Sequence, residues 1–188
     1  PAKMKIFTYE GEKDTIMKPT DSIIYYKHML QTGMMAMEPR SGHIKAWVGG
    51  VNYKYFQYDH VGQGARQVGS TFKPFLYATA IEQLGMAPCD SIIDSYFTMP
   101  KGKWGIDKDW SPKNSDGNYR GTTTLQKALA NSINTVSAKL IDRVGPKAVV
   151  DMAKELGVTS DIPEQPSIAL GAVDITVEQM VGAMSTFA

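Results

Sequence analysis

The sequence predicts an α+β fold, in which one antiparallel hairpin precedes a mostly helical body. Residues 33–38 and 44–48 have the composition of two strands, and the proline and glycine of residues 39–42 are typical of the turn of a hairpin. After residue 68, apolar residues recur at the three- and four-residue spacing of helices. Strands therefore come first and helices follow, without the regular alternation that indicates a parallel sheet.

We expect the chain to divide into an N-terminal segment, residues 1–30, and a main domain, residues 31–188. The N-terminal segment is linker-like: Met4 to Phe7 fits a short strand, residues 10–18 are polar and loop-like, and Asp21-Ser22 can cap a short helix that runs to Leu30. Residues 51–68 are aromatic and polar without periodicity, so we expect them to form a loop over the functional site.

Capping residues and glycines predict where the helices of the main domain begin and end. Residues 123–126 are typical of a capping box that starts a short helix through Leu129, and a second box at 176–179 starts the last helix. Gly145-Pro146 ends the helix between them. Residues 86–121 contain several prolines and glycines, which predicts a long irregular segment.

The Ser70-x-x-Lys73 motif is the first candidate for chemistry. A helix that starts near Ser70 places both side chains on one face, one turn apart, and Pro74 is tolerated only in a first turn. A serine hydroxyl is a weak nucleophile until a base takes its proton, and a desolvated lysine can have a pKa low enough to act as that base. The alternative is structural, with Ser70 as a helix cap and Lys73 as an exposed residue of the first turn.

Ser132-Ile133-Asn134 is the second candidate, at a predicted corner between two helices. In an extended corner, residues two apart can point their side chains the same way. A serine hydroxyl can relay a proton, and an asparagine amide can both donate to and accept from an amide substrate. Serine and asparagine are also common caps, so this motif alone leaves the structural alternative open.

Composition argues against several other classes of function. The net charge of +1 gives no sign of a nucleic-acid surface, and His28, His43 and His60 lack the spacing of zinc ligands. We find no P-loop, no dinucleotide fingerprint and no Gly-x-Ser-x-Gly, and the single cysteine cannot form an internal disulfide. No apolar run approaches the roughly 18 residues that a membrane-spanning helix needs.

Taken together, the two motifs match a known set. A Ser-x-x-Lys followed by a Ser-x-Asn triplet is part of the signature of penicillin-binding proteins and β-lactamases. The chain resembles the transpeptidase domain of class A (bifunctional) penicillin-binding proteins from about Gln31 to its last residue. Further stretches carry the same resemblance: 36–50, 59–70, 110–114 with 119–121, 166–171 and 185–188.

The resemblance implies a fold and a chemistry. The hairpin would begin a five-stranded antiparallel sheet, and the activity would be D,D-transpeptidation of peptidoglycan stem peptides, with acylation by β-lactams. Ser70 would be the nucleophile, Lys73 its base, Ser132 part of the proton route and Asn134 the residue that holds the acyl-side amide. The resemblance implies no cofactor, no metal and no nucleic-acid partner, and it places the parent protein on the outer side of the bacterial cytoplasmic membrane.

One element of the family signature does not occur in the sequence. There is no Lys-Thr-Gly or Lys-Ser-Gly. We therefore expect a fragment of a longer protein that also carries the remaining sheet strands, a glycosyltransferase and a membrane anchor. We further expect the fragment alone to be inactive and to self-associate through its incomplete sheet. The alternatives are a catalytically silent structural or interaction fragment and a D,D-carboxypeptidase of the same superfamily.

Overall fold

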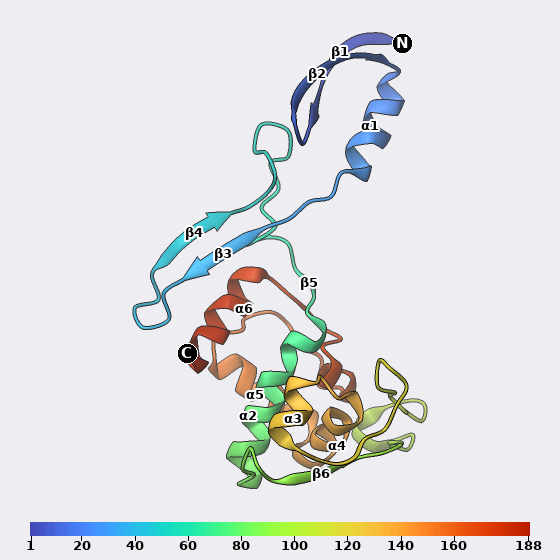
Figure 1. Ribbon diagram of the computed structural model, residues 1–188, viewed down its shortest axis with the longest axis vertical. Coiled ribbons are helices and arrows are strands. Elements are labelled where there is room, and N and C mark those ends of the chain that lie inside the picture. Colours follow the sequence, from blue (N-terminus) through green and yellow to red (C-terminus); the bar gives the residue numbers. More distant parts are fainter.

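The computed structural model describes all residues from 1 to 188 and shows three parts arranged along one long axis (Figure 1). An N-terminal unit comprises β1 (Ala2–Thr8), β2 (Gly11–Met17) and α1 (Pro19–His28). A two-stranded ribbon of β3 (Met34–Met37) and β4 (Ile44–Val48) lies between this unit and the helical body. The predicted order of a hairpin followed by helices is confirmed for the main domain.

The N-terminal unit is more regular than predicted. The loop expected at 10–18 is wrong, because β2 pairs with β1 along its whole length, from Ala2 opposite Met17 to Thr8 opposite Gly11. Most side chains of β2 are exposed, so its polar composition conceals the strand. Helix α1 starts at Pro19, before the predicted Asp21-Ser22 cap, since proline fits a first helical turn that needs no N–H donor.

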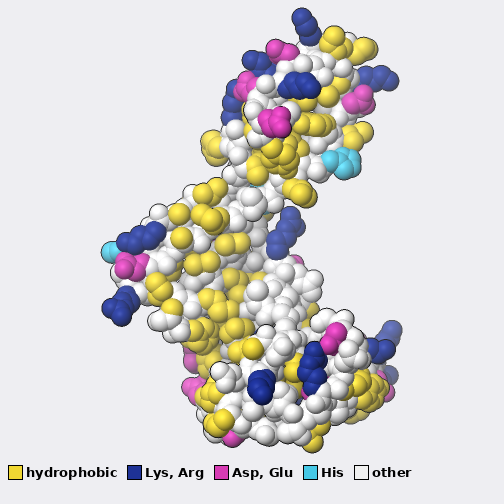
Figure 2. All heavy atoms as spheres, in the orientation of Figure 1, with side chains coloured by type: hydrophobic (Ala, Val, Ile, Leu, Met, Phe, Trp, Pro, Cys, Tyr) yellow, Lys and Arg dark blue, Asp and Glu magenta, His cyan; other side chains and the backbone are white.

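The β3–β4 ribbon is confirmed where the hairpin was predicted. Its strands are antiparallel, with Met34 opposite Val48 and a bulge after Ala36. One face contacts α6 (Val177–Met184), and Met35 is buried there. The ribbon also exposes four large apolar side chains: Met34, Ile44, Trp47 and Val48. Figure 2 shows hydrophobic side chains, in yellow, over this middle part of the molecule.

We expected the loop between β4 and β5 (Arg66–Gln67) to lie over the predicted site, and this prediction is wrong. It contacts the N-terminal unit instead, where the Tyr55 ring lies 5.4 Å from the Phe7 ring and 6.2 Å from the Tyr26 ring, between centroids. The Tyr55 hydroxyl also donates to Glu12 over 2.7 Å. The aromatic composition of this loop therefore serves packing between two parts of the chain.

Helix α2 (Lys73–Leu84) lies at the centre of the helical body and packs against α4 (Asn134–Val144) and α5 (Pro146–Glu155). Its buried apolar side chains Phe75, Leu76 and Ala80 belong to one continuous hydrophobic core. The remaining elements of the body are α3 (Leu125–Ala130), the 3₁₀ turns η1 (Gly69–Phe72), η2 (Lys103–Gly105), η3 (Pro166–Leu170) and η4 (Ser185–Phe187), and the strand β8 (Asp174–Ile175). None of the helices combines the length and the apolar character that crossing a bilayer requires.

Three details of the body differ from the sequence predictions. Residues 86–121 are not wholly irregular, because β6 (Ser91–Asp94) pairs with β7 (Gly121–Thr124). The N-cap of α3 is Thr124, whose hydroxyl accepts from the Lys127 backbone N–H, rather than Thr123 as a 123–126 box requires. The cap of α6 is Thr176 as predicted, but the Gln179 side chain binds the backbone of residues 159 and 160 instead of closing the box.

Candidate active site

Ser70 lies in the 3₁₀ turn η1, directly before helix α2. Gly69 has φ +55°, in the left-handed region that favours glycine, so the chain can turn sharply just before the serine. The Lys73 backbone N–H donates to the Ser70 carbonyl, and α2 continues from Lys73 with Pro74 in its first turn. The predicted helix start near Ser70 is thus confirmed, with one 3₁₀ turn preceding the α-helix. The Ser70 side chain is exposed.

A second backbone segment, residues 171–173, holds this turn in place through hydrogen bonds to residues 68 and 69. The Gly69 N–H donates to the Gly171 carbonyl over 3.1 Å, and the Val68 N–H donates to the Val173 carbonyl over 3.0 Å. Gly171 has φ +73°, and a Cβ atom there would overlap the backbone of Gly69. Glycine is therefore required at 171 both for its conformation and for the close approach of the two backbones.

Lys73 is the most buried charged side chain of the site, with 1% of its surface exposed. Its Nζ donates to the Ser132 carbonyl over 2.7 Å, to the Ser132 hydroxyl over 3.0 Å and to the Asn134 amide oxygen over 2.8 Å. All three acceptors are neutral. Burial without a carboxylate partner disfavours the charged form and lowers the pKa of the Lys73 ammonium to about 8.

The contacts of Nζ suit either protonation state of Lys73. A protonated amine has three N–H donors for its three acceptors, whereas a neutral amine has two N–H donors and one lone pair. The Ser132 carbonyl and the Asn134 amide oxygen can only accept, but the Ser132 hydroxyl can also donate. The neutral amine can thus stay fully hydrogen-bonded by accepting from Ser132, which is a property that a proton carrier needs.

Ser132 and Asn134 reach Lys73 because the chain reverses sharply between α3 and α4. The predicted corner is confirmed, but its backbone is not extended, since Ser132 has φ +52°. The Ser132 and Ile133 N–H groups donate to the carbonyls of Leu129 and Ala128 and so close the end of α3. This left-handed conformation directs both the carbonyl and the hydroxyl of Ser132 at the same amine.

The structure thus brings three of the four predicted site residues into direct contact: Lys73, Ser132 and Asn134. Ser70 lies one turn before Lys73, and its hydroxyl makes no hydrogen bond in this structure. Reasoning from the sequence also missed several residues that hold the site. Gly171, Asn114 and Asp94 are the main examples. Asn114 and Gly171 fall in stretches that carry the family resemblance, 110–114 and 166–171, whereas no sequence pattern marks Asp94.

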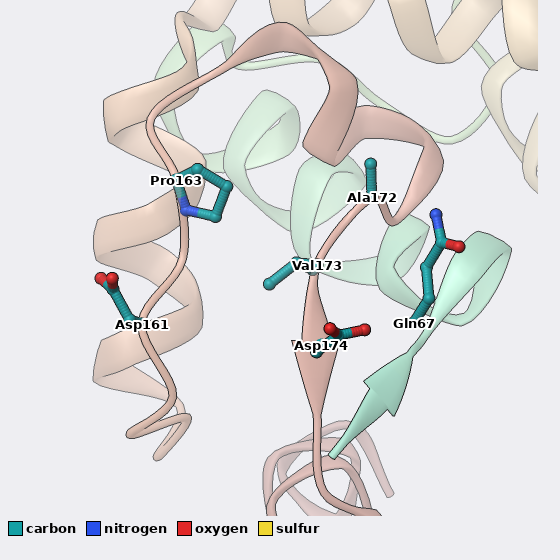
Figure 3. Close-up of a pocket in the computed structure, with 6 residues that line it drawn as sticks. All are labelled: Gln67, Asp161, Pro163, Ala172, Val173 and Asp174. Carbon is teal, nitrogen blue, oxygen red and sulfur yellow. The ribbon is translucent and has the colours of Figure 1, made fainter.

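A cavity of about 430 Å³ lies beside the segment 171–173 and shares no lining residue with the Lys73 contacts (Figure 3). Its lining comes from the β5–β8 pair and the loop after α5: Gln67, Asp161, Pro163, Ala172, Val173 and Asp174. None of the four predicted site residues lines it. The structure holds no group of three or more histidine, cysteine or carboxylate side chains arranged to bind a metal ion.

Comparison with known families identifies this arrangement. Residues 32–188 match the family model described as the penicillin binding protein transpeptidase domain, and residues 1–30 match the one described as the penicillin-binding protein middle domain. The chain belongs to the penicillin-binding protein transpeptidase family. The resemblance inferred from Ser-x-x-Lys, Ser-x-Asn and the surrounding stretches is therefore confirmed at the level of the family.

Two relatives show how much of the chain the similarity covers. Penicillin-binding protein 1A of Neisseria flavescens is 37% identical over 161 residues, which is 85% of this chain and 20% of that protein. Penicillin-binding protein 1A of Aquifex aeolicus is 37% identical over 162 residues, 85% of this chain and 21% of that protein. The chain therefore spans about a fifth of the length of these curated relatives.

Solved structures support the same fold. The crystal structure of penicillin-binding protein 1A from Haemophilus influenzae superimposes with a TM-score of 0.78 at 29% identity, over 84% of this chain and 23% of that one. The PonA1 protein from Mycobacterium tuberculosis, in complex with penicillin V, gives a TM-score of 0.69 at 26% identity, over 89% of this chain and 46% of that one. The predicted fold class, a partial transpeptidase fold of the α+β type, is confirmed.

Proposed function

We propose that this chain carries the nucleophile-bearing part of a peptidoglycan D,D-transpeptidase that works through a serine acyl-enzyme and is acylated by β-lactams. The observation that carries the proposal is the environment of Lys73. Its amine is buried, has a pKa lowered to about 8, and contacts both polar residues of the Ser132-x-Asn134 triplet. It also follows an exposed serine by one turn of the chain.

In this proposal, Ser70 attacks the carbonyl of the D-Ala–D-Ala bond, and its proton passes to the neutral amine of Lys73. Ser132, hydrogen-bonded to Nζ at 3.0 Å, then gives its hydroxyl proton to the leaving D-Ala and takes one back from the Lys73 ammonium. The acyl-enzyme is then resolved by an amine of a neighbouring stem peptide. Asn134 holds the amide on the acyl side of the substrate. These steps need neither a metal nor a cofactor.

The partners follow from the same chemistry. They are peptidoglycan stem peptides and β-lactams, and PonA1, a relative in structure, is described in complex with penicillin V. We place the protein in the bacterial cell envelope, on the outer side of the cytoplasmic membrane where peptidoglycan is cross-linked. An anchor outside these 188 residues would hold it there.

Penicillin labelling followed by mass spectrometry tests the proposal. We expect a labelled penicillin to acylate Ser70 in a longer chain that also carries a Lys-Thr-Gly or Lys-Ser-Gly motif, and Ser70→Ala to abolish the label. Label that survives in Ser70→Ala would refute the assignment of the nucleophile. We further propose that the 188 residues alone are acylated slowly or not at all, because an oxyanion donor elsewhere in the domain contributes about 10²–10³ in rate.

Two other functions give different results. A catalytically silent structural or interaction module would not be labelled even in the longer chain. A D,D-carboxypeptidase would be labelled as well, so a peptide substrate ending in D-Ala–D-Ala distinguishes it: after D-Ala leaves, it would release the peptide acyl group to water instead of transferring it to an added amino acid acceptor. The exposed apolar side chains of the β3–β4 ribbon favour self-association as a property of the short chain. Analytical ultracentrifugation of the 188-residue chain and of the longer chain distinguishes this association from monomeric behaviour.

A further inference from the structure

Asn134 is held at both its backbone and its side chain by two consecutive residues. The Lys113 carbonyl accepts from the Asn134 side-chain Nδ2 over 2.9 Å. The Asn114 side-chain Oδ1 accepts from the backbone N–H groups of Asn134 and Thr135, over 2.9 Å and 3.2 Å. Helix α4 begins at Asn134 and has no side-chain cap from its own N-cap residue, so Asn114 caps it from another segment of the chain.

A buried carboxylate fixes the orientation of the Asn114 amide. The Asn114 Nδ2 donates to Asp94 Oδ1 and to the Asn118 carbonyl, both over 2.8 Å. The Thr135 hydroxyl donates to the same Asp94 oxygen over 2.5 Å, and the Arg120 backbone N–H donates to the other over 2.9 Å. An ionised carboxylate can only accept, so Asn114 must turn its NH₂ group toward Asp94 and its oxygen toward α4.

Asp94 is suited to this task because it stays ionised. Only 1% of its surface is exposed, and burial by itself would raise the pKa of the carboxyl. Hydrogen bonds from Thr135, Asn114 and the Arg120 backbone outweigh burial and lower the pKa below its usual range. The Arg120 guanidinium lies 3.7 Å away and is the nearest cation. The acceptor that orients Asn114 is thus present at neutral pH.

These contacts leave one donor of Asn134 free. Its Oδ1 accepts from Lys73, and its Nδ2 uses one of two N–H bonds on the Lys113 carbonyl. The second N–H has a fixed direction, because the backbone and both side-chain atoms of Asn134 are restrained. A donor restrained in this way can select a carbonyl group at one position.

We infer that Asn114, oriented by Asp94 and Thr135, is a positioning residue that aims the free N–H of Asn134 at the amide carbonyl on the acyl side of the substrate. This inference rests on the proposed function, since it assigns a task to a residue of the same site. Neither Asn114 nor Thr135 touches the reacting atoms. Their effect on the reaction passes through Asn134 alone.

The test compares two β-lactams in the full-length protein that contains this chain. Benzylpenicillin has an acylamino side chain, whereas 6-aminopenicillanic acid has the same bicyclic core and a free amine in its place. For Asn114→Ala we expect the acylation rate constant with benzylpenicillin to fall about 3- to 10-fold, the value of one hydrogen bond, and the constant with 6-aminopenicillanic acid to stay within about 2-fold. Thr135→Val keeps the shape of the side chain, and we expect it to cause a smaller loss of the same kind.

Ser137→Ala is the matched control. Ser137 is buried in the same helix, and its hydroxyl donates to the Ile133 carbonyl over 3.1 Å without contacting Asp94 or Asn114. We expect this variant to treat the two ligands alike. If thermal melting shows that Asn114→Ala does not fold, Thr135→Val carries the same comparison.

A double-mutant cycle completes the design. In an Asn134→Ala background, Asn114→Ala should cause little further loss with benzylpenicillin, because its effect acts through Asn134. Equal losses with both ligands, or additive losses in the cycle, would overturn the inference while leaving the proposed function intact. Failure of both ligands to label Ser70 in the unmodified protein would overturn the proposed function and this inference with it.

Discussion

The titration of Lys73 gives the sharpest prediction from this structure. The perturbation is a change of pH between 6 and 10, and the measured quantity is the rate constant for acylation of Ser70 at a fixed, subsaturating concentration of penicillin. If the neutral amine of Lys73 is the base, this rate constant follows the neutral fraction of Lys73. Burial lowers the pKa from its ordinary value of 10.5 to about 8, so the neutral form predominates above pH 8 and the ammonium below it.

The expected magnitude follows from that pKa. With a pKa near 8, the neutral fraction is roughly 10% at pH 7 and roughly 90% at pH 9, so the rate constant should rise about 10-fold and then level off. With an unshifted pKa, the same interval would give a rise of about 100-fold with no plateau before pH 10. The two profiles differ enough for stopped-flow measurements with a chromogenic β-lactam to separate them.

Asn134→Asp supplies the second arm of this test. The substitution is nearly isosteric and puts a carboxylate in place of the neutral oxygen that accepts from Nζ at 2.8 Å. An opposite charge at that distance favours the ammonium, so the inflection should move to higher pH by about 1–3 pH units. The position of the inflection is the readout, because the absolute rate also reflects the loss of an amide donor.

A rate constant that climbs toward pH 10 without a plateau would refute a neutral Lys73 as the base and leave it a purely electrostatic role. An inflection near pH 8 that Asn134→Asp does not move would also refute the reasoning, since the titrating group would then lie elsewhere. Intact folding across the range is checked by circular dichroism at each pH. This control matters because a change of fold would imitate a loss of activity.

Three other predictions concern how the site is held. Gly171→Ala should destabilise the protein by much more than Gly157→Ala. Both glycines have positive φ, which costs a residue with a Cβ about 1–2 kcal/mol, but only at 171 does the new Cβ also overlap the Gly69 backbone. Thermal unfolding of both variants measures the difference in stability. Lys73→Met replaces a buried amine by an apolar side chain, which should raise the free energy of unfolding. The rise should be smaller than the added apolar burial alone would give, because the three acceptors of Nζ lose their donor; denaturant titration measures this free energy. Tyr55→Ala should increase hydrogen exchange in β1 and β2, since its ring packs on Phe7 and Tyr26, whereas Tyr53→Ala, 79% exposed, should not.

Local patterns in the sequence were sufficient for elements whose cause is local. The β3–β4 hairpin was predicted from its turn residues, and the start of α2 from Gly69 and Pro74. The strand β2 was missed because its side chains are mostly exposed, and a two-stranded ribbon with solvent on its faces has no apolar alternation to detect. The loop at 51–68 was assigned to the wrong place, because aromatic residues indicate burial without indicating the partner that buries them.

The candidate site shows the same division between local and distant causes. The spacing of Ser70 and Lys73 is local, so their placement one turn apart could be predicted. The contacts of Lys73 with Ser132 join residues 59 apart, and family resemblance rather than spacing suggested them. The left-handed backbone of Ser132 and the network of Asp94 with Asn114 depend on tertiary packing, and no periodicity reports either of them.

The features of Lys73 that cost stability are the ones that its proposed role requires. A drop in pKa from 10.5 to about 8 corresponds to about 3 kcal/mol of penalty on the charged form. Its place in the first turn of α2, at the positive end of the helix, disfavours a cation further. Neither the desolvation of the ammonium nor its place at the helix end stabilises the fold, since an apolar side chain at this position would pack without either penalty. Both favour the neutral amine beside an exposed serine, so the fold tolerates a locally unfavourable lysine at the position where the proposed mechanism needs a base.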